Sequence, residues 1–368
     1  KSEREAENAR AKADRDAAKE TSNAYIELAK RKNELAQAQA ELDRLQDGDP
    51  QIEATKKRID LLEDEINKKQ EVINKNDQLA LAVNIAAGDM TLFRGKDKFK
   101  VSEIASLRTV ISRLNQREGR IMHDKRIREA LVSCLDRETY NKVLLKGTFL
   151  PGKAPVPPSL DYGFDQLKDP NAYNVERAKK LLAEAGWKDT NGDGFVEKNG
   201  SGKNVELDYI FYTSRAELPT YAEATQADAK KIGIKINIKS VDYNILEPMR
   251  SKGGYGLIIS NILTANTGDP EIFLDWYWKT NKNGSQPLNA TGYSNPEFDK
   301  LSDQVKVEFD PAKRREAFIK MQQILVNDGA ALFFGYPKTN MVSRANIENA
   351  NIYPADYYWI TKDIKVKK

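Results

Sequence analysis

Cysteine and histidine are nearly absent from this sequence of 368 residues, which has one of each. The single cysteine, Cys134, excludes an internal disulfide and any zinc cluster built from cysteines. It lies in the apolar stripe of a predicted helix, "ALVSCLDRE", where we expect a buried and inert thiol. The single histidine, His123, removes most routes to histidine-based metal binding or to a Ser/His/Asp triad. We therefore predict a chain that is not an enzyme and that has no cofactor.

Long apolar runs and a dominant sign of charge are also missing. The 59 basic and 55 acidic residues leave a formal net charge of only +4, which predicts no nucleic-acid partner. No apolar run is long enough to span a membrane. The sequence begins "KSEREAENAR", without an apolar segment, so we expect no secretion signal within it.

The stretch "DTNGDGFVE", residues 189–197, resembles the opening of a calcium-binding EF-hand loop. Its oxygen side chains alternate at Asp189, Asn191 and Asp193, and a glycine follows. That loop requires a bidentate glutamate at its twelfth position, which here is Gly200. The Asn-Gly and Asp-Gly pairs are typical of tight turns. We therefore predict a turn at this place and no metal site.

The first 86 residues predict a helical hairpin. They contain one aromatic residue, Tyr25, and many strong helix formers. Gly48 can end one helix and Pro50 can begin the next. Apolar residues repeat every seven positions on both sides of this turn, at Leu28, Leu35 and Leu42 and at Ile52, Ile59, Ile66 and Ile73. The pattern favours an antiparallel coiled coil over residues 1–86 that brings Leu35 near Ile59–Ile66, with a solitary charged helix as the alternative.

Residues 87–120 predict a small α+β element. "TLFRGKDKFKV" indicates two strands around Gly95–Asp97, and Ser102 is a candidate cap for a helix that ends near "NQREGR". This β-hairpin and helix resemble small phage head–tail joining proteins. No residue before position 121 belongs to a catalytic pattern.

From residue 121 the pattern predicts a mixed α/β domain that extends to residue 368. Three strands are expected with two helices between them, and the β-α-β-α-β order favours parallel strands. The strands are expected at 205–212, 234–240 and 255–261, and the helices around 219–232 and 245–252. Gly186 is expected to end an earlier helix, whereas Asn295-Pro296 and Asp310-Pro311 begin two later ones. No glycine-rich phosphate loop follows these strands, which counts against a nucleotide enzyme.

Five segments of residues 121–368, taken in order, resemble the C-terminal lobe of family 5 extracellular solute-binding proteins. They are "DKRIREALVSCLDRETYNKVLLKG", "NVERAKKLLAEAGWKDTNGDG", "GDPEIFLDWYW", "GYSNPEFDKL" and "YPADYYWITKDIKVKK". Proteins of this family are the oligopeptide, dipeptide and nickel receptors of ABC importers. The resemblance implies a type II periplasmic-binding-protein-like α/β lobe, an extracytoplasmic location, and ABC permease subunits as partners.

The resemblance also implies ligand-binding residues. In peptide-binding relatives an aspartate shortly before the "GDP" segment holds the ligand's ammonium group, and Asn266 occupies that position here. An amide lacks the charge that makes such a bond strong, which weakens the dipeptide interpretation and leaves room for a nickel chelate or another small solute. Asp269, which precedes Pro270, either contacts the ligand or caps the next helix. Arg250 is a candidate partner for a ligand carboxylate.

Three adjacent aromatic residues complete the predicted site. Trp276, Tyr277 and Trp278 point about 100° apart if they lie on a helix, so at least one is expected to be exposed or to face a cleft. The alternative is that all three pack in the core. The nearby loop Thr264–Asp269 follows a predicted strand at its C-terminal end, where open α/β sheets place their ligands.

One feature departs from the family. These receptors have a long N-terminal lobe, whereas this chain has the predicted hairpin in that place. We therefore expect a truncated or fused substrate-binding component of an ABC importer, with solute affinity near the ~1 mM end of the usual range. The alternative is a structural or assembly protein whose hairpin mediates self-association or binds a protein partner.

Overall fold

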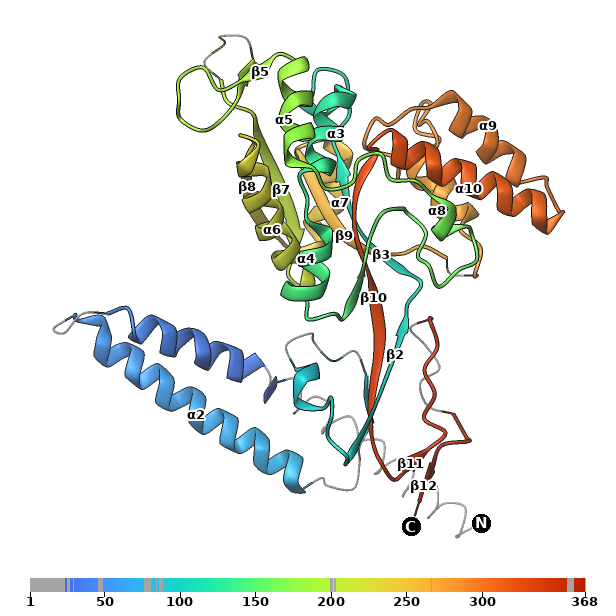
Figure 1. The fold of residues 1–368 in the computed structure, drawn as a ribbon. Helices are drawn as coiled ribbons and strands as arrows, with labels where there is room; N and C mark the ends of the chain where they lie inside the picture. Colours follow the sequence, from blue (N-terminus) through green and yellow to red (C-terminus); the bar gives the residue numbers. More distant parts are fainter. Residues whose placement is uncertain are drawn as a thin grey trace. The chain divides into compact units, whose positions relative to one another are not determined.

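A computed structural model describes residues 24, 27–28, 30–45, 49–75, 81–83, 85, 89–198, 201, 203–265, 267–286, 288–355 and 361–367. The chain divides into two compact units (Figure 1). The second unit contains Ala105–Lys338 and Pro354–Asp356, and the first contains the remaining residues. Strand β10 (Ala331–Arg344) contributes its beginning to the second unit and its end to the first.

Two helices run antiparallel in the first unit (Figure 1). The earlier one includes residues 30–42 and the later one is α2 (Gln51–Lys75). Ion pairs join Arg31 to Glu65 and Glu41 to Arg58 at 2.6 and 3.1 Å, a pairing order that only antiparallel helices allow. Leu35 lies between these ion pairs on its helix, as Ile59 and Leu62 do on α2. Gly48, where the hairpin is predicted to turn, lies outside the described residues.

The rest of the first unit is a small sheet with its own core. Strands β1 (Leu81–Val83) and β2 (Phe99–Ala105) pair with β10. Met90, Phe93 and Val342 form the core beside them. The short strands β11 (Ile347–Glu348) and β12 (Lys365–Val366) pair with each other.

Of the predictions for residues 87–120, the second strand of the hairpin is confirmed by the start of β2, whereas the first strand and the helix are wrong. A 3₁₀ turn, η1 (Met90–Leu92), replaces the first predicted strand, and β2 and β3 (Arg108–Leu114) replace the helix predicted from Ser102. Strand β3 is rich in β-branched residues, which suit a strand. Val110 and Ile111 lie in different apolar cores, so β3 is buried on both faces and lacks the alternation that reveals a half-exposed strand. Consequently the second unit begins at Ala105, before the predicted boundary at residue 121.

The sheet of the second unit has the strand order β10-β3-β9-β7-β8. Strand β7 (Glu206–Tyr212) is parallel to β8 (Lys235–Val241) and to β9 (Leu257–Leu263). Helices α6 (Glu217–Lys231) and α7 (Tyr243–Lys252) connect them, which confirms the predicted β-α-β-α-β order. Strand β3 is antiparallel to β9 and β10.

Helices cover both faces of this sheet, each over an apolar core. One core includes residues of α3 (Lys125–Ser133), α5 (Val175–Glu184) and α6. The other includes residues of α8 (Glu271–Trp278), α9 (Pro296–Val305) and α10 (Pro311–Asn327). Asn295 and Asp310 cap α9 and α10 as predicted. Smaller elements are η2 (Ile121–His123), α4 (Arg137–Thr139), η3 (Tyr140–Leu144), β4 (Phe149–Pro151), η4 (Phe164–Gln166), β5 (Trp187–Lys188) and β6 (Glu197–Lys198).

Candidate ligand-binding site

The C-terminal ends of β7, β8 and β9 lie together along one end of the second unit's sheet, which we call its C-terminal edge. Because these strands are parallel, the residues that follow them meet at this edge, where open α/β sheets bind ligands. The first turn of α6 and the start of α7 follow directly from β7 and β8. The predicted ligand loop Thr264–Asp269 follows β9 at the same edge, but its Asn266 lies outside the described residues.

A polar cluster occupies this edge. The Asn261 side chain donates to Glu217 Oε1 at 2.5 Å, and the Asn261 backbone amide donates to Tyr212 Oη at 3.4 Å. Asn261 Oδ1 is buried and has no hydrogen-bond partner among the described residues. Tyr243 lies edge-on to Tyr212 with 5.1 Å between ring centroids, and most of its own side chain is exposed. The cluster therefore combines an unpaired amide oxygen, a carboxylate and an accessible aromatic ring.

The electrostatics of the cluster suit a polar ligand. Burial raises the pKa of Tyr212, against the opposing effect of the amide of Asn261, so the phenol is neutral at physiological pH. Glu217 is half-buried in the first turn of α6, where the helix dipole favours a negative charge. A carboxylate in a half-buried position is a good acceptor for a cationic or hydrogen-bonding group.

The predicted aromatic residues occupy different environments on α8. Trp276 is 50% exposed, whereas Trp278 is 2% exposed and packs in the core. Tyr277 lies between these extremes, and the Arg113 guanidinium is 5.4 Å from its ring centroid. Trp276 is thus the member of the run that offers a free face for stacking.

The other predicted residues are held by neighbours within the protein. Asp269 Oδ1 accepts from the Glu271 amide at 2.8 Å, although the N-cap residue of α8 is Pro270, and Oδ2 accepts from Arg314 at 2.9 Å. Arg250 is fully enclosed and donates to the Leu288 carbonyl. A buried side chain cannot contact a solute without rearrangement, so we leave Arg250 out of the site.

Sequence reasoning missed Tyr212, Glu217, Tyr243 and Asn261. The available signal was their position directly after, or near the end of, the predicted parallel strands. Asn261 and Glu217 are 44 residues apart, and sequence alone does not show that they meet.

The single cysteine and the single histidine both contact other parts of the protein. Cys134 is buried, and burial raises the pKa of its thiol, which opposes the thiolate that reactive cysteines need. His123 Nδ1 is 2.9 Å from the Gln116 carbonyl oxygen.

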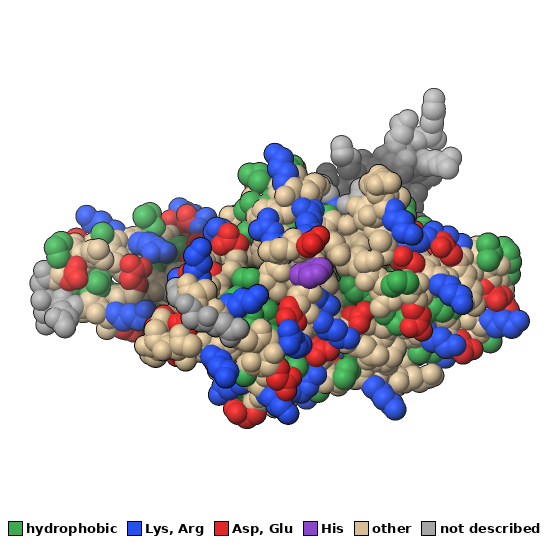
Figure 2. Space-filling model, turned by 90° about the horizontal axis from the view of Figure 1, so that it is seen from above, with side chains coloured by type: hydrophobic (Ala, Val, Ile, Leu, Met, Phe, Trp, Pro, Cys, Tyr) green, Lys and Arg blue, Asp and Glu red, His purple; other side chains and the backbone are tan. Residues whose placement is uncertain are grey.

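Figure 2 shows basic and acidic side chains interspersed over the face that it displays. In the described part of the chain, no helix is both long and apolar enough to cross a bilayer.

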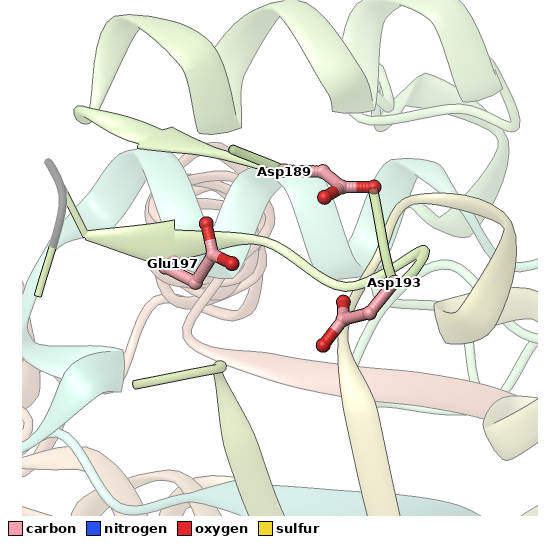
Figure 3. A group of neighbouring side chains, drawn as sticks. All are labelled: Asp189, Asp193 and Glu197. Carbon is pink, nitrogen blue, oxygen red and sulfur yellow. The ribbon is translucent and has the colours of Figure 1, made fainter. Parts of the chain in front are cut away.

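The turn between β5 and β6 brings together side chains of a type that can bind metal ions. Asp189, Asp193 and Glu197 each place a carboxylate oxygen within 4.8 Å of the other two (Figure 3). Gly200, on which the sequence argument against calcium rested, lies outside the described residues.

Residues 64–285 match the family model described as "Bacterial extracellular solute-binding proteins, family 5 Middle". The match spans more than half of the chain, which therefore belongs to this family. The matched residues begin inside α2, N-terminal to the five segments on which the sequence resemblance rests.

Individual relatives agree with this membership. The chain is 28% identical over 303 residues to the oligopeptide-binding protein AppA of Bacillus subtilis, which covers 78% of this chain and 54% of AppA. It is 24% identical to the nickel-binding protein NikA of Staphylococcus aureus, with 76% and 53% covered. The chain thus spans about half the length of these curated relatives.

Solved structures show the same fold. The structure of B. subtilis AppA in complex with a nonapeptide has a TM-score of 0.64 at 26% identity, covering 76% of this chain and 54% of that one. The structure of NikA from Brucella suis in complex with Fe(III)-EDTA has a TM-score of 0.69 at 19% identity, covering 78% and 57%. The fold is therefore that of periplasmic-binding-protein-like α/β proteins.

Proposed function

We propose that this chain binds a small solute at the C-terminal edge of β7–β9, as part of a substrate-binding component of an ABC importer. The observation that carries the proposal is the cluster of Tyr212, Glu217, Tyr243 and Asn261, in which a buried amide oxygen has no partner among the described residues. Family membership supports the importer role and an extracytoplasmic location, with permease subunits as partners. The solute classes are those for which the relatives are named, peptides and nickel complexes.

We include Trp276 in the proposed site because it lies on α8, within ten residues of the Thr264–Asp269 loop in sequence. Its exposed ring supplies stacking surface, and we still predict that Asn266, which lies outside the described residues, contacts the ligand. Because Asn266 is an amide, we expect poor affinity for free dipeptides. Glu217 is the carboxylate of the cluster, so a cationic group of the solute is expected to lie near α6.

The proposal is tested by titrating the 368-residue chain with an alanine tripeptide and with the nickel(II)–histidine complex, followed by tryptophan fluorescence and thermal shift. We expect one probe to saturate and to raise the melting temperature. Tyr243→Ala should weaken its binding about three- to tenfold, the value of an aromatic contact of about 0.5–1.5 kcal/mol. If the solute is cationic, Glu217→Gln should weaken its binding more than Tyr243→Ala does.

Tyr173→Ala is the matched control. Tyr173 is 48% exposed, but its phenol is one of the groups that raise the pKa of Lys231, which lies at the opposite end of α6 from Glu217. This variant should bind as the parent chain does. Failure of both probes to bind, or binding that Tyr243→Ala and Glu217→Gln leave unchanged, would contradict the proposed site.

We also propose that the N-terminal helices form an antiparallel coiled coil, as their heptads predict. In this proposal the coiled coil is structural and does not contact the solute. Ala24 and Leu28 pack with Ile66, and the Arg31–Glu65 ion pair flanks this contact. These contacts support the pairing of the two heptad seams.

A further inference from the structure

Three carboxylates converge in the turn between β5 and β6, away from the ligand-binding edge. Asp189 follows β5, Asp193 lies within the turn, and Glu197 begins β6 (Figure 3). Their nearest oxygens lie within 4.8 Å of one another. Lys235 acts electrostatically on Asp193 but forms its ion pair with Glu206. Three anions this close repel one another, and Asp193 is stabilised in part by hydrogen bonds from Asn204, Asn191 and the amide of Phe195.

Glu197 provides an independent sign of a missing ligand. Its side chain is only 1% exposed. Oε2 accepts from the amide and hydroxyl of Thr190 at 2.9 and 2.7 Å. Oε1 is buried and has no hydrogen-bond partner among the described residues. A buried carboxylate oxygen without a partner is unfavourable and therefore unusual, and this carboxylate belongs to the group that converges with Asp189 and Asp193.

Hydrogen bonds from its own backbone fix the conformation of this turn. Asp189 accepts from the amides of Gly192 and Gly194 at 2.7 and 3.0 Å, and Asp193 accepts from the amide of Phe195 at 2.8 Å. Both glycines have positive φ angles, 78° and 86°, which glycine adopts without strain. Each carboxylate has about four lone-pair sites, so these bonds leave oxygens available to a cation.

We propose that Asp189, Asp193 and Glu197 bind one calcium ion. Asn191, between the two aspartates in sequence, is a fourth candidate ligand, and waters complete the six to eight oxygens that calcium takes. The carboxylate that Gly200 lacks is supplied by Glu197, which pairing of β5 with β6 places opposite Lys188. A flexible set of carboxylates and one amide suits calcium better than magnesium, which requires near-octahedral geometry. This inference replaces the sequence-based expectation of no metal.

Calorimetric titration of the EDTA-treated 368-residue chain with CaCl₂ tests the site. We expect one ion per chain with a Kd of about 10⁻⁴–10⁻³ M, as in extracellular calcium modules. Glu197→Gln keeps the size of the side chain and removes its charge, and it should weaken binding at least tenfold. Asp193→Asn should do the same at an exposed position that is less important for folding. Circular dichroism confirms that each variant is folded.

Asp165→Asn is the control, because Asp165 is an exposed aspartate of the same unit outside the turn, and it should bind calcium as the parent does. The proposal is overturned if the parent chain shows no saturable binding up to about 10 mM calcium, well above the expected range. It is equally overturned if Asp193→Asn binds as tightly as the parent, or if magnesium binds with equal affinity. None of these outcomes depends on solute binding at the other edge.

Discussion

At the scale of the residue, Asp328 is the clearest case of a carboxylate held by converging donors. Burial by itself would raise its pKa, but hydrogen bonds from Asn295, Lys125 and Tyr293 outweigh burial and lower it. The three donors lie 2.8–3.0 Å from its oxygens. The ionised form is therefore the one that the folded protein stabilises.

This arrangement predicts a pH-dependent contribution to stability. The folded pKa lies below the value of about 3.9 of an unfolded aspartate, so the stabilisation is present above that value and is lost as the pH falls through the folded pKa. We expect Asp328→Asn to lower the free energy of unfolding by about 1–3 kcal/mol at pH 7. Urea denaturation at pH 7 and at pH 3 should show this difference shrinking at the lower pH. A difference of equal size at both pH values would contradict the role of ionised Asp328.

Individual site residues were predictable only where local geometry determined them. The spread of Trp276–Trp278 around a helix follows from its pitch, and the structure exposes Trp276 while burying Trp278. The Asp269-Pro270 pair correctly predicted a helix that begins directly after it. By contrast, the Asn261–Glu217 contact depends on where α6 begins relative to β9, and the burial of Glu197 depends on the pairing of β5 with β6. Neither relation can be read from local sequence.

At the scale of the element, the correct predictions are those with clear periodicity and clear boundaries. Strands β7, β8 and β9 and the helices between them appeared in the sequence as apolar runs separated by turn residues. Strand β3 did not, because "RTVISRL" packs against cores on both faces and has no polar face to set its period. Its place between β9 and β10 is a long-range property, which explains the misplaced boundary.

The N-terminal hairpin allows a prediction from two adjacent leucines on α2. Leu62 is 7% exposed and Leu61 is 66% exposed. Leu62 therefore lies on the buried face of α2 and Leu61 on the solvated face of the same helical turn. We expect Leu62→Ala to destabilise the hairpin by about 2–5 kcal/mol, the range for a buried leucine, or less if the helices readjust. Leu61→Ala should be neutral or slightly stabilising, because alanine is the better helix former.

Hydrogen exchange of the α2 amides measures this difference directly. Faster exchange in Leu62→Ala than in Leu61→Ala is expected throughout Gln51–Lys75. Equal exchange in the two variants would show that α2 does not use this face for packing, and the proposed coiled coil would be untenable.

At the scale of the whole molecule, each unit has its own core, and the two proposed sites of the second unit lie at opposite ends of one strand. Asn204 bridges to Glu197 just before β7 begins, whereas Tyr212 ends β7 in the ligand cluster. The seven residues of β7 span roughly 20 Å at about 3.3 Å each. Strand β7 is buried along most of this length, and the two proposed sites have no residue in common. We therefore expect little energetic coupling between the two sites.

Hydrogen exchange with and without calcium tests this expectation, whether or not the solute is known. Calcium should slow exchange of the amides in Asp189–Glu197, where the ion would hold the turn closed. It should leave the amides of Tyr212–Glu217 and Thr264–Ala265 unchanged, because no described ligand of the ion contacts them. In Asp193→Asn the calcium-dependent protection should disappear. If calcium instead slowed exchange at both ends of β7, the sites would be coupled, and by reciprocity solute binding would have to change the affinity for calcium.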